Sequence, residues 1–218
     1  MDNIERVEPL PAPARKRSAT RTRAALMKAA LKEFSQHGFA GARIDQIAKA
    51  AKCNIRMLYH YFGGKKQLYV AMLEAAYADL RQKEARLSID PEQPLEGMME
   101  LMDFTFGYFQ NNPMFEGLLR AENMMHGKFV SRSTLVPEGA TGLKQTIRAL
   151  IASGRAKGLF RDDLDPVHIY VTMTALSRFH LANSFTMSAV LGVDMRDKVW
   201  RTERLEHCRQ LLKAHLLR

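Results

Sequence analysis

Apolar residues recur every three or four positions along most of the chain, and no long segment alternates with the period of two that is typical of a β-strand. This spacing predicts an all-α fold. Glycine, proline and an Asn–Asn–Pro sequence break the pattern into segments. The predicted helices cover residues 18–37, 43–51, 55–61, 65–88, 95–110, 113–125, 138–157, 166–183 (extending to about 190) and 194–217, and residues 127–136 are expected to form a loop.

Two short helices joined by a tight turn are predicted over residues 43–61, after a longer supporting helix. Ala48 and Ala51 are small, as a close crossing of the two helices requires, while Leu58 and Phe62 point inward. The opposite face of the second short helix carries Ile55, Arg56, Met57, Tyr59, His60 and Tyr61. This face suits the major groove of DNA, where arginine binds guanine and apolar groups contact the thymine methyl. Packing of its two tyrosines against neighbouring helices is the alternative interpretation.

Positive charge is concentrated around the same helices. The chain has a net charge of +10, and residues 15–66 contain 13 Lys or Arg but only two acidic residues. Clustered cations release counterions from phosphates, so this concentration favours binding to a polyanion over a solvated basic face. The basic residues before or early in the first helix are expected to follow the DNA backbone or enter the minor groove, unless they form a plain basic tail. They are Arg15, Arg17, Arg21 and Arg23.

The segment IDQIAKAAKCNIRMLYHYFGGKKQLY, residues 44–69, resembles the signature of the TetR family of bacterial transcriptional regulators. The resemblance extends over about residues 22–73 and includes Phe34, Gly38 and Phe39. It implies a helix-turn-helix DNA-binding domain over residues 15–64 and a helical effector-binding and dimerisation domain over 65–218. Residues 1–14 are rich in proline and lack periodicity, so they are expected to form a disordered arm. The implied function is a repressor that binds a palindromic operator as a homodimer and is released by a small-molecule effector.

The resemblance also implies roles for individual residues. Tyr59 and Lys65 would contact phosphates, and Arg43 would lie where a phosphate meets the second helix. Asn54 would cap the recognition helix and touch the DNA backbone. Arg56, Met57 and His60 would face base edges, and Ile55 belongs to the same predicted DNA-binding face.

Three positions depart from the family pattern. Ala42 stands where threonine is usual, so a cap or phosphate contact of the second helix is expected to be missing or shifted. Lys52 replaces the usual turn glycine, which predicts a non-glycine residue in a strained conformation. Arg56 replaces a small residue and is expected to change the base preference.

The rest of the chain is expected to bind an effector and a second subunit. Methionine and aromatic residues cluster in residues 95–110, and the flexible thioether is common at tolerant binding surfaces, although core packing is the alternative for each residue. The predicted ligand-binding residues are Met102, Phe106, Phe109, Asn123, His126, Met173, Ser177 and His180. Residues 179–192 are similar to the branch of the family that contains the pyrimidine-utilisation regulator. The predicted dimer interface consists of Val199, Leu205, Leu212 and Leu216, unless these residues pack within one subunit.

Several other functions are disfavoured. The chain has no long apolar segment typical of a membrane span and no secretory signal, and its two cysteines, Cys53 and Cys208, favour a reducing cytoplasm. No paired ligand spacing predicts a metal, no motif predicts a cofactor, and no nucleophile–base arrangement predicts an enzyme. Two alternatives to the ligand-released repressor remain open, which are a DNA-binding regulator without a ligand and a helical carrier that binds membranes through its positive charge.

Overall fold

The computed structural model describes residues 12–218, and within that range its regular structure is helical. One isolated bridge pairs Phe160 with Leu217 near the C-terminus. The prediction of an all-α fold is confirmed. The helices are α1 (Ala12–Gly41), α2 (Ile44–Ala50), α3 (Ile55–Phe62), α4 (Lys65–Glu84), α5 (Pro94–Asn111), α6 (Pro113–Met124), η1 (Val130–Arg132), α7 (Leu135–Gly139), α8 (Thr141–Ala156), α9 (Pro166–Ala182), α10 (Ser184–Leu191) and α11 (Lys198–Leu216).

Several helix boundaries differ from the prediction, and α4 ends four residues earlier and α11 begins four residues later than predicted. α1 begins at Ala12 instead of residue 18, because alanine, arginine and lysine favour a helix and Pro13 is tolerated in its first turn. Asn183 separates α9 from α10. The expected loop over residues 127–136 contains η1 and the start of α7. The predicted disordered arm covers residues 1–14, of which residues 1–11 lie outside the described part of the chain. The prediction is wrong for residues 12–14, which belong to α1.

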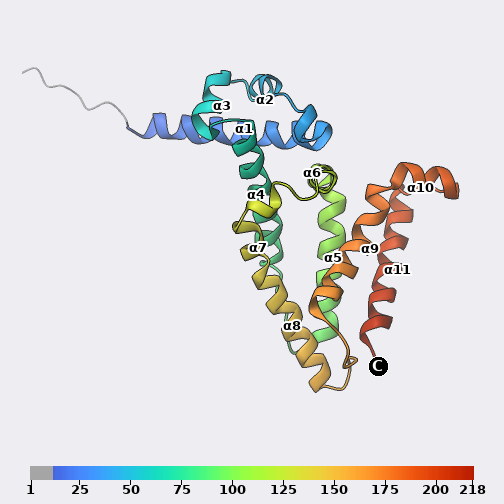
Figure 1. Ribbon diagram of the computed structural model, residues 1–218. Helices are drawn as coiled ribbons and strands as arrows, with labels where there is room; N and C mark the ends of the chain where they lie inside the picture. Colours follow the sequence, from blue (N-terminus) through green and yellow to red (C-terminus); the bar gives the residue numbers. More distant parts are fainter. Residues whose placement is uncertain (1–11) are drawn as a thin grey trace, which may run out of the picture.

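The molecule has two parts that α4 connects (Figure 1). α1 lies across one end, with α2 and α3 on its outer side, and α4 leads from this end into a bundle that contains α5, α8, α9 and α11. α6 packs against α1, so it joins the bundle to the first part. Gly117 of α6 permits this approach, since a Cβ atom there would lie 2.7 Å from the backbone oxygen of Ser35.

The first part surrounds a cluster of buried residues that we call the N-terminal core. Phe34 of α1, Ile47 of α2, Leu58 of α3 and Tyr69 of α4 are fully buried in it. Phe129, from the loop after α6, belongs to the same cluster and is 2% exposed. The packing therefore extends beyond residue 64, where the sequence predicted the end of the DNA-binding domain.

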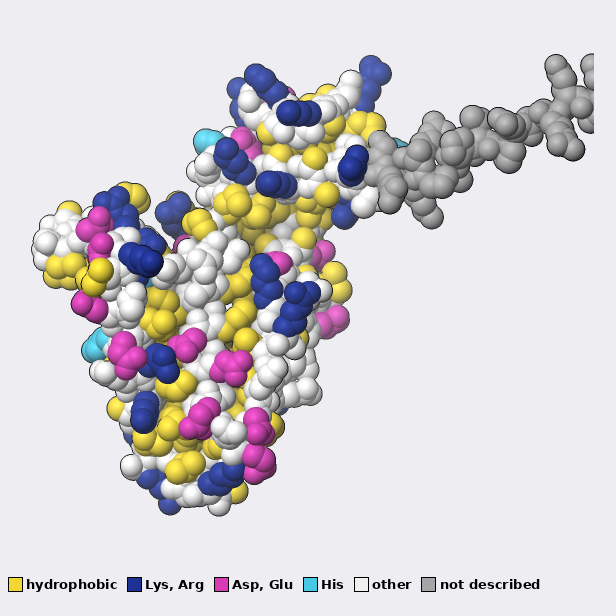
Figure 2. All heavy atoms as spheres, turned by 180° about the vertical axis from the view of Figure 1, so that it is seen from behind, with side chains coloured by type: hydrophobic (Ala, Val, Ile, Leu, Met, Phe, Trp, Pro, Cys, Tyr) yellow, Lys and Arg dark blue, Asp and Glu magenta, His cyan; other side chains and the backbone are white. Residues whose placement is uncertain are grey.

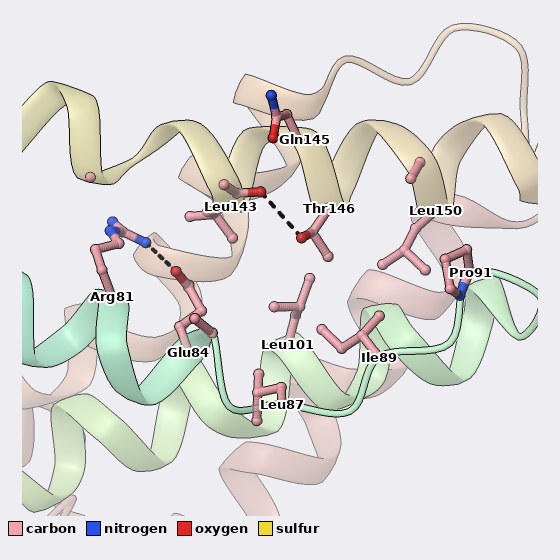
Figure 3. Close-up of a pocket in the computed structure, with 14 residues that line it drawn as sticks. Arg81, Glu84, Leu87, Ile89, Pro91, Leu101, Leu143, Gln145, Thr146 and Leu150 are labelled. Atoms are coloured by element: carbon pink, nitrogen blue, oxygen red, sulfur yellow. Dashed lines mark hydrogen bonds and ion pairs between the residues drawn. The ribbon is translucent and has the colours of Figure 1, made fainter.

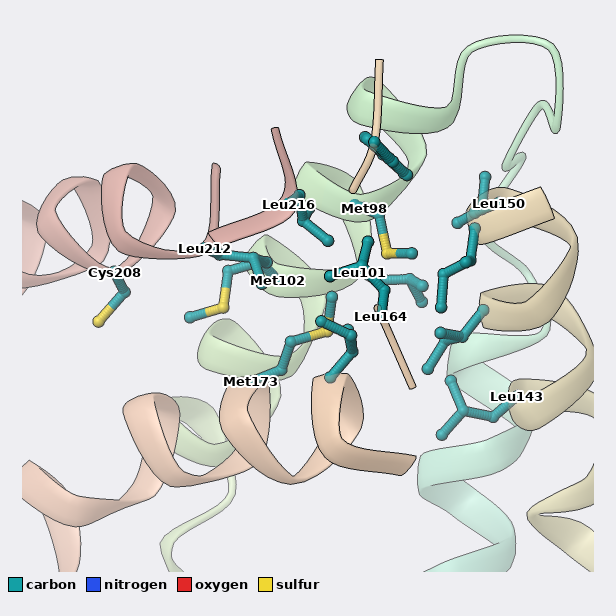
Figure 4. Packing of buried hydrophobic residues seen from close by; sticks show 14 of the residues in the cluster. Met98, Leu101, Met102, Leu143, Leu150, Leu164, Met173, Cys208, Leu212 and Leu216 are labelled. Carbon is teal, nitrogen blue, oxygen red and sulfur yellow. The ribbon is translucent and has the colours of Figure 1, made fainter. Parts of the chain in front are cut away.

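The bundle surrounds a second cluster, the C-terminal core, which is rich in methionine and leucine (Figure 4). It joins α5, α8, α9 and α11, and its fully buried residues include Met98, Met102, Met173 and Leu212. These helices thus form one packed unit at the end of the molecule that is opposite α3 (Figure 1).

Candidate nucleic-acid interface

The turn between α2 and α3 has the geometry that its sequence predicted. Lys52 has a positive φ of 53°, so the expected strained residue is confirmed. At the start of α2, Arg43 is the N-cap and provides no side-chain cap, as the alanine at position 42 led us to expect. The backbone N–H of Arg43 instead donates to Oε1 of Glu33 on α1 at 3.0 Å, which ties the helix start to the scaffold.

Side chains of α3 divide into an inner and an outer face. Leu58 and Phe62 are buried in the N-terminal core, while Ile55 and Tyr59 are 37% and 49% exposed. The residues Arg56 and His60 are also exposed, and Met57 and Tyr61 are half-buried. The predicted presentation of this helix to the outside is confirmed, and the outer face is free to contact another molecule.

Both ends of α3 are fixed by local interactions. The Oδ1 atom of Asn54 accepts a hydrogen bond from the backbone N–H of Arg56 at 2.9 Å, so the predicted cap is confirmed. Gly63 ends the helix with a φ of 77°, a left-handed conformation that favours glycine. The short helix therefore begins and ends at defined residues although it has only eight.

The cations near α3 differ in what they contact. The guanidinium of Arg43 pairs with Asp45 at 3.2 and 2.9 Å, which lowers the pKa of that carboxyl group. The Nζ of Lys65 donates to the carbonyl oxygen of Ala40 at 3.3 Å and lies 5.0 Å from the ring centre of Phe39. Within the described residues, the guanidinium of Arg56 makes no hydrogen bond or ion pair, so it is the least constrained of the three.

Further basic residues lie on α1. Arg21 is exposed, and the guanidinium of Arg23 lies 5.1 Å over the ring of Phe62 at the end of α3. The backbone at Arg15 and Arg17 is helical, while their side chains lie outside the described part. Lys and Arg side chains surround the domain of α1, α2 and α3 in Figure 2, and most of the acidic side chains visible there lie on the bundle. The first part of the molecule thus presents a positive surface.

The N-terminal and C-terminal parts each match a family of known proteins. Residues 26–72 match the bacterial regulatory proteins of the tetR family, and residues 94–212 match a tetracyclin repressor-like C-terminal domain. The chain belongs to the TetR family of bacterial transcriptional regulators. Proteins of this family bind DNA operators, and they are regulators and not enzymes. The resemblance inferred from residues 44–69 is confirmed.

Named relatives cover most of this TetR-family chain. The transcriptional repressor NicS of Pseudomonas putida is 40% identical over 184 residues, which are 84% of this chain and 87% of NicS. The transcriptional repressor SCO4008 of Streptomyces coelicolor is 30% identical, over 72% of this chain and 77% of its own. The regulator RutR of Escherichia coli is 25% identical, over 91% and 92% of the two chains.

Solved structures show the same fold. The regulator SCO4942 of Streptomyces coelicolor has a TM-score of 0.67 at 22% identity, covering 89% of this chain and 98% of its own. A TetR regulator of Chloroflexus aurantiacus has a TM-score of 0.64 at 20% identity, covering 93% and 100%. The fold class predicted from the sequence is thus shared with known regulators.

The structure brings some of the predicted ligand-binding residues together between α5 and α9. Met102, Phe106, Met173, Ser177 and His180 are each at most 2% exposed, and Ser177 donates to the backbone oxygen of Met173 at 2.7 Å. The rings of Phe106 and His180 are stacked at 5.1 Å. These side chains pack against one another in the interior, which agrees with the alternative that they belong to the hydrophobic core.

The other three predicted ligand residues lie apart from this group. Phe109 is buried beside Tyr108 and Phe115 in a separate cluster. Asn123 and His126 are exposed around the end of α6, and the side-chain amide of Asn123 donates to the backbone of Leu119. The eight predicted residues therefore do not form one site.

A cavity that sequence reasoning missed lies between the end of α4, the segment before α5, and α8 (Figure 3). Its volume is about 530 Å³, and none of the eight predicted ligand residues lines it. Arg81 and Glu84, three residues apart on α4, form an ion pair at its edge. The spacing of three residues shows in the sequence that Arg81 and Glu84 can pair on one helix face. Such pairs usually lie on the solvent-exposed surface, so the sequence alone does not indicate that this pair borders a cavity.

The predicted dimer residues are divided between surface and interior. Val199 is 65% exposed, whereas Leu205 is half-buried against the C-terminal core. Leu212 and Leu216 are fully buried in their own subunit, so the prediction that they contact a partner is wrong. The exposed apolar side chains on α9 and α11 are Val167, Val171, Phe179, Val199 and Leu211.

Residues 12–218 offer neither a metal-binding cluster nor a membrane-spanning helix. No three His, Cys, Asp or Glu side chains of this range come together in a group that could hold a metal ion. No described helix is both long enough and apolar enough to cross a membrane. Burial raises the pKa of the Cys53 thiol in the α2–α3 turn and of the Cys208 thiol, which disfavours the reactive thiolate.

Proposed function

We propose that this TetR-family regulator is a repressor that binds a palindromic operator as a homodimer and leaves it when a small-molecule effector binds. The observation that carries the DNA-binding step is the outer face of α3, where Ile55, Arg56, Tyr59 and His60 are exposed on a helix fixed at both ends. The names of NicS and SCO4008, both repressors, support the direction of control.

On DNA, α3 lies in the major groove and the surrounding cations contact phosphates. Arg56, His60 and Met57 face base edges, because they lie on or beside the outer face. Tyr59 and Lys65 contact the backbone, as does Arg43 once its ion pair with Asp45 opens. Arg21, with Arg15 and Arg17, adds charge from α1 along the neighbouring backbone.

The homodimer forms through the outer sides of α9 and α11. Val167, Val171 and Phe179 lie at spacings of four and eight residues on α9, so they share one face, and each is more than half exposed. Val199 and Leu211 add exposed apolar area on α11. A two-fold arrangement through this surface presents two copies of α3 to successive turns of one DNA face, which is why the operator is palindromic.

The test is selection of bound fragments from random duplex DNA with purified full-length protein, followed by footprinting. We expect an inverted repeat whose half-site centres lie one helical turn, about 10 base pairs, or a multiple apart. A single unrepeated site would contradict the homodimer, and equal retention of all sequences at moderate salt would contradict the regulator itself.

The dimer surface has its own test. Val171→Glu places a charge in the middle of the exposed stripe on α9, and we expect monomers in sedimentation velocity and loss of binding to the full palindrome. Lys144→Glu, which changes an exposed residue of α8, is the matched control and leaves the dimer intact. A Val171→Glu protein that remains dimeric would show that the subunits meet elsewhere.

A further inference from the structure

The cavity beside α4 has one polar and one apolar end (Figure 3). Arg81 and Glu84 lie at the polar end, near the part of α8 that carries Leu143. Ile89, Pro91 and Leu150 lie at the opposite end. A space of about 530 Å³ with mostly apolar walls and a few polar groups is within the range of small-molecule pockets.

The polar end is electrically neutral. Arg81 and Glu84 are the only charged side chains among the residues that line the cavity, and Nη1 of the arginine lies 2.6 Å from Oε2 of the glutamate. The two side chains are 14% and 8% exposed, so water screens their charges weakly. A bound anion would meet the carboxylate of Glu84, and a bound cation would meet Arg81, so an uncharged molecule fits this end best.

Free hydrogen-bond acceptors are available at this end of the cavity. Arg81 donates from Nη1 to Glu84 and from Nη2 to the hydroxyl of Tyr170, and each of these nitrogens has a second N–H, while its Nε is enclosed. Glu84 Oε1 makes no hydrogen bond within the described residues, and the hydroxyl of Thr146 donates to the backbone of Gly142, which leaves its lone pairs free. A molecule that donates an O–H or N–H from one end satisfies these acceptors.

We propose that this cavity is the effector site and that it takes an uncharged, mainly apolar molecule that donates a hydrogen bond to Glu84 or Thr146. The regulatory consequence rests on the proposed function. α4 is a single helix that begins at Lys65, two residues after α3, and ends at Glu84. A molecule held against its last turn acts on the same helix that supports α3.

The test compares four probes of nearly equal shape with full-length protein. Benzyl alcohol is uncharged and donates a hydrogen bond, benzoate is an anion, benzylammonium is a cation, and toluene has no polar group. Binding is measured by ligand-observed NMR titration. We expect benzyl alcohol to bind at least tenfold more tightly than either ion and more tightly than toluene. Preference for benzoate or benzylammonium, or no binding by any probe, would overturn the proposal.

Three variants locate the binding. A Cβ atom on either Gly142 or Gly107 meets no atom within 4 Å, but only Gly142 lines the cavity. Gly142→Leu therefore abolishes benzyl alcohol binding, while the matched control Gly107→Leu retains it. Glu84→Gln leaves Arg81 without its counter-charge, so the order reverses and benzoate becomes the tighter probe. If Gly142→Leu still binds benzyl alcohol, or if Glu84→Gln does not change the order of the probe affinities, the proposed site is wrong.

The outcomes separate this site from the proposed function. Operator selection requires no effector, so it gives its answer whether or not the probes bind. If the protein selects a palindrome but does not bind benzyl alcohol, the proposed DNA-binding function stands and the proposed effector site is wrong. If the protein binds benzyl alcohol, Gly142→Leu abolishes this binding, and no duplex is selected, then the proposed site stands and the proposed repressor function is wrong.

Discussion

The two cores of the molecule are filled by different kinds of side chain. In the N-terminal core, the rings of Phe34, Phe39, Tyr69 and Phe129 contact one another at centre distances of 4.5 to 5.2 Å for four of their pairs. The C-terminal core contains the buried methionines Met98, Met102 and Met173 (Figure 4), whereas Met72 is the buried methionine of the N-terminal core. Aromatic rings have few rotamers, whereas the thioether of methionine adapts to changes in its surroundings. The domain that must present α3 thus has more ring contacts in its core, and the domain expected to respond to a ligand has more of the adaptable methionine side chains.

Phe129 shows that the two regions are not independent. It follows α6, yet it is buried in the N-terminal core. Glu122 of α6 is 3% exposed, and its Oε1 accepts hydrogen bonds from the backbone N–H groups of Phe129 and Val130 at 2.6 and 2.8 Å. A movement of α6 therefore displaces a ring that supports α3.

The largest expected effect comes from removing that ring. Phe129→Ala leaves a cavity in the N-terminal core, and we expect the free energy of unfolding to fall by about 3–5 kcal/mol. DNA affinity should fall with it. The measurement is urea unfolding followed by circular dichroism. Phe185→Ala is the control, since Phe185 is 74% exposed on α10 and its loss should change stability little. A cost for Phe129→Ala as small as that of the control would show that the N-terminal core is closed without the second half of the chain.

Acidification should destabilise the protein through His180, which is buried in the C-terminal part. Burial lowers the pKa of His180 to about 4, with contributions from Arg204 and Arg201, and both ring nitrogens lack partners within the described residues. The unfolded chain, with an ordinary pKa near 6.5, binds a proton that the native state does not bind between these values. The free energy of unfolding therefore falls as the pH drops from 6.5 toward 4, by about 2–3 kcal/mol at pH 4.5 for this residue.

His180→Phe tests this contribution because a phenyl ring can take the place of the imidazole, stacked on Phe106 and tilted against Trp200. Urea unfolding at pH 7 and pH 4.5 measures how much stability each protein loses on acidification. The variant should lose less than the original chain by the stated amount. Equal losses in the two proteins would mean that His180 accepts a proton without cost in the folded state.

The sequence predicted the DNA-binding face better than the effector and dimer sites. The face of α3 follows from local rules, since Asn54 as the cap and the inward spacing of Leu58 and Phe62 determine which side chains point outward. The buried state of Leu212 and the exposed state of Val199 depend on which side of α11 meets its own subunit, and α11 carries apolar residues on both sides. The cavity depends on packing between α4 and α8, which no local pattern reports.

Mutations can distinguish the residues of the N-terminal part that contact bases from those that contact phosphates. Arg56→Ala should relax preference at one base pair of the operator, at a cost of about 1–3 kcal/mol on the preferred sequence. Lys65→Ala should weaken binding to all sequences and reduce the salt slope by about 1. Competition binding on single-base operator variants at several salt concentrations measures both. Lys66→Ala changes an exposed neighbour of Lys65 and controls for the general loss of one charge. Two mutants with the same sequence and salt profile would refute the assignment of contacts.

The smallest expected effect concerns the turn that sets the angle between α2 and α3. Lys52 has a φ of 53°, a conformation that costs a side chain roughly 1–2 kcal/mol, while glycine adopts it freely but loses about 0.5–1 kcal/mol through the entropy of the unfolded chain. Lys52→Gly should therefore stabilise the protein by about 0.5–1 kcal/mol in urea unfolding. Lys49→Gly, one turn earlier within α2, should destabilise it by about the same amount because that residue is helical. If both substitutions destabilise the protein equally, the turn does not hold Lys52 in a strained state, and the rigidity of this region rests on the aromatic core alone.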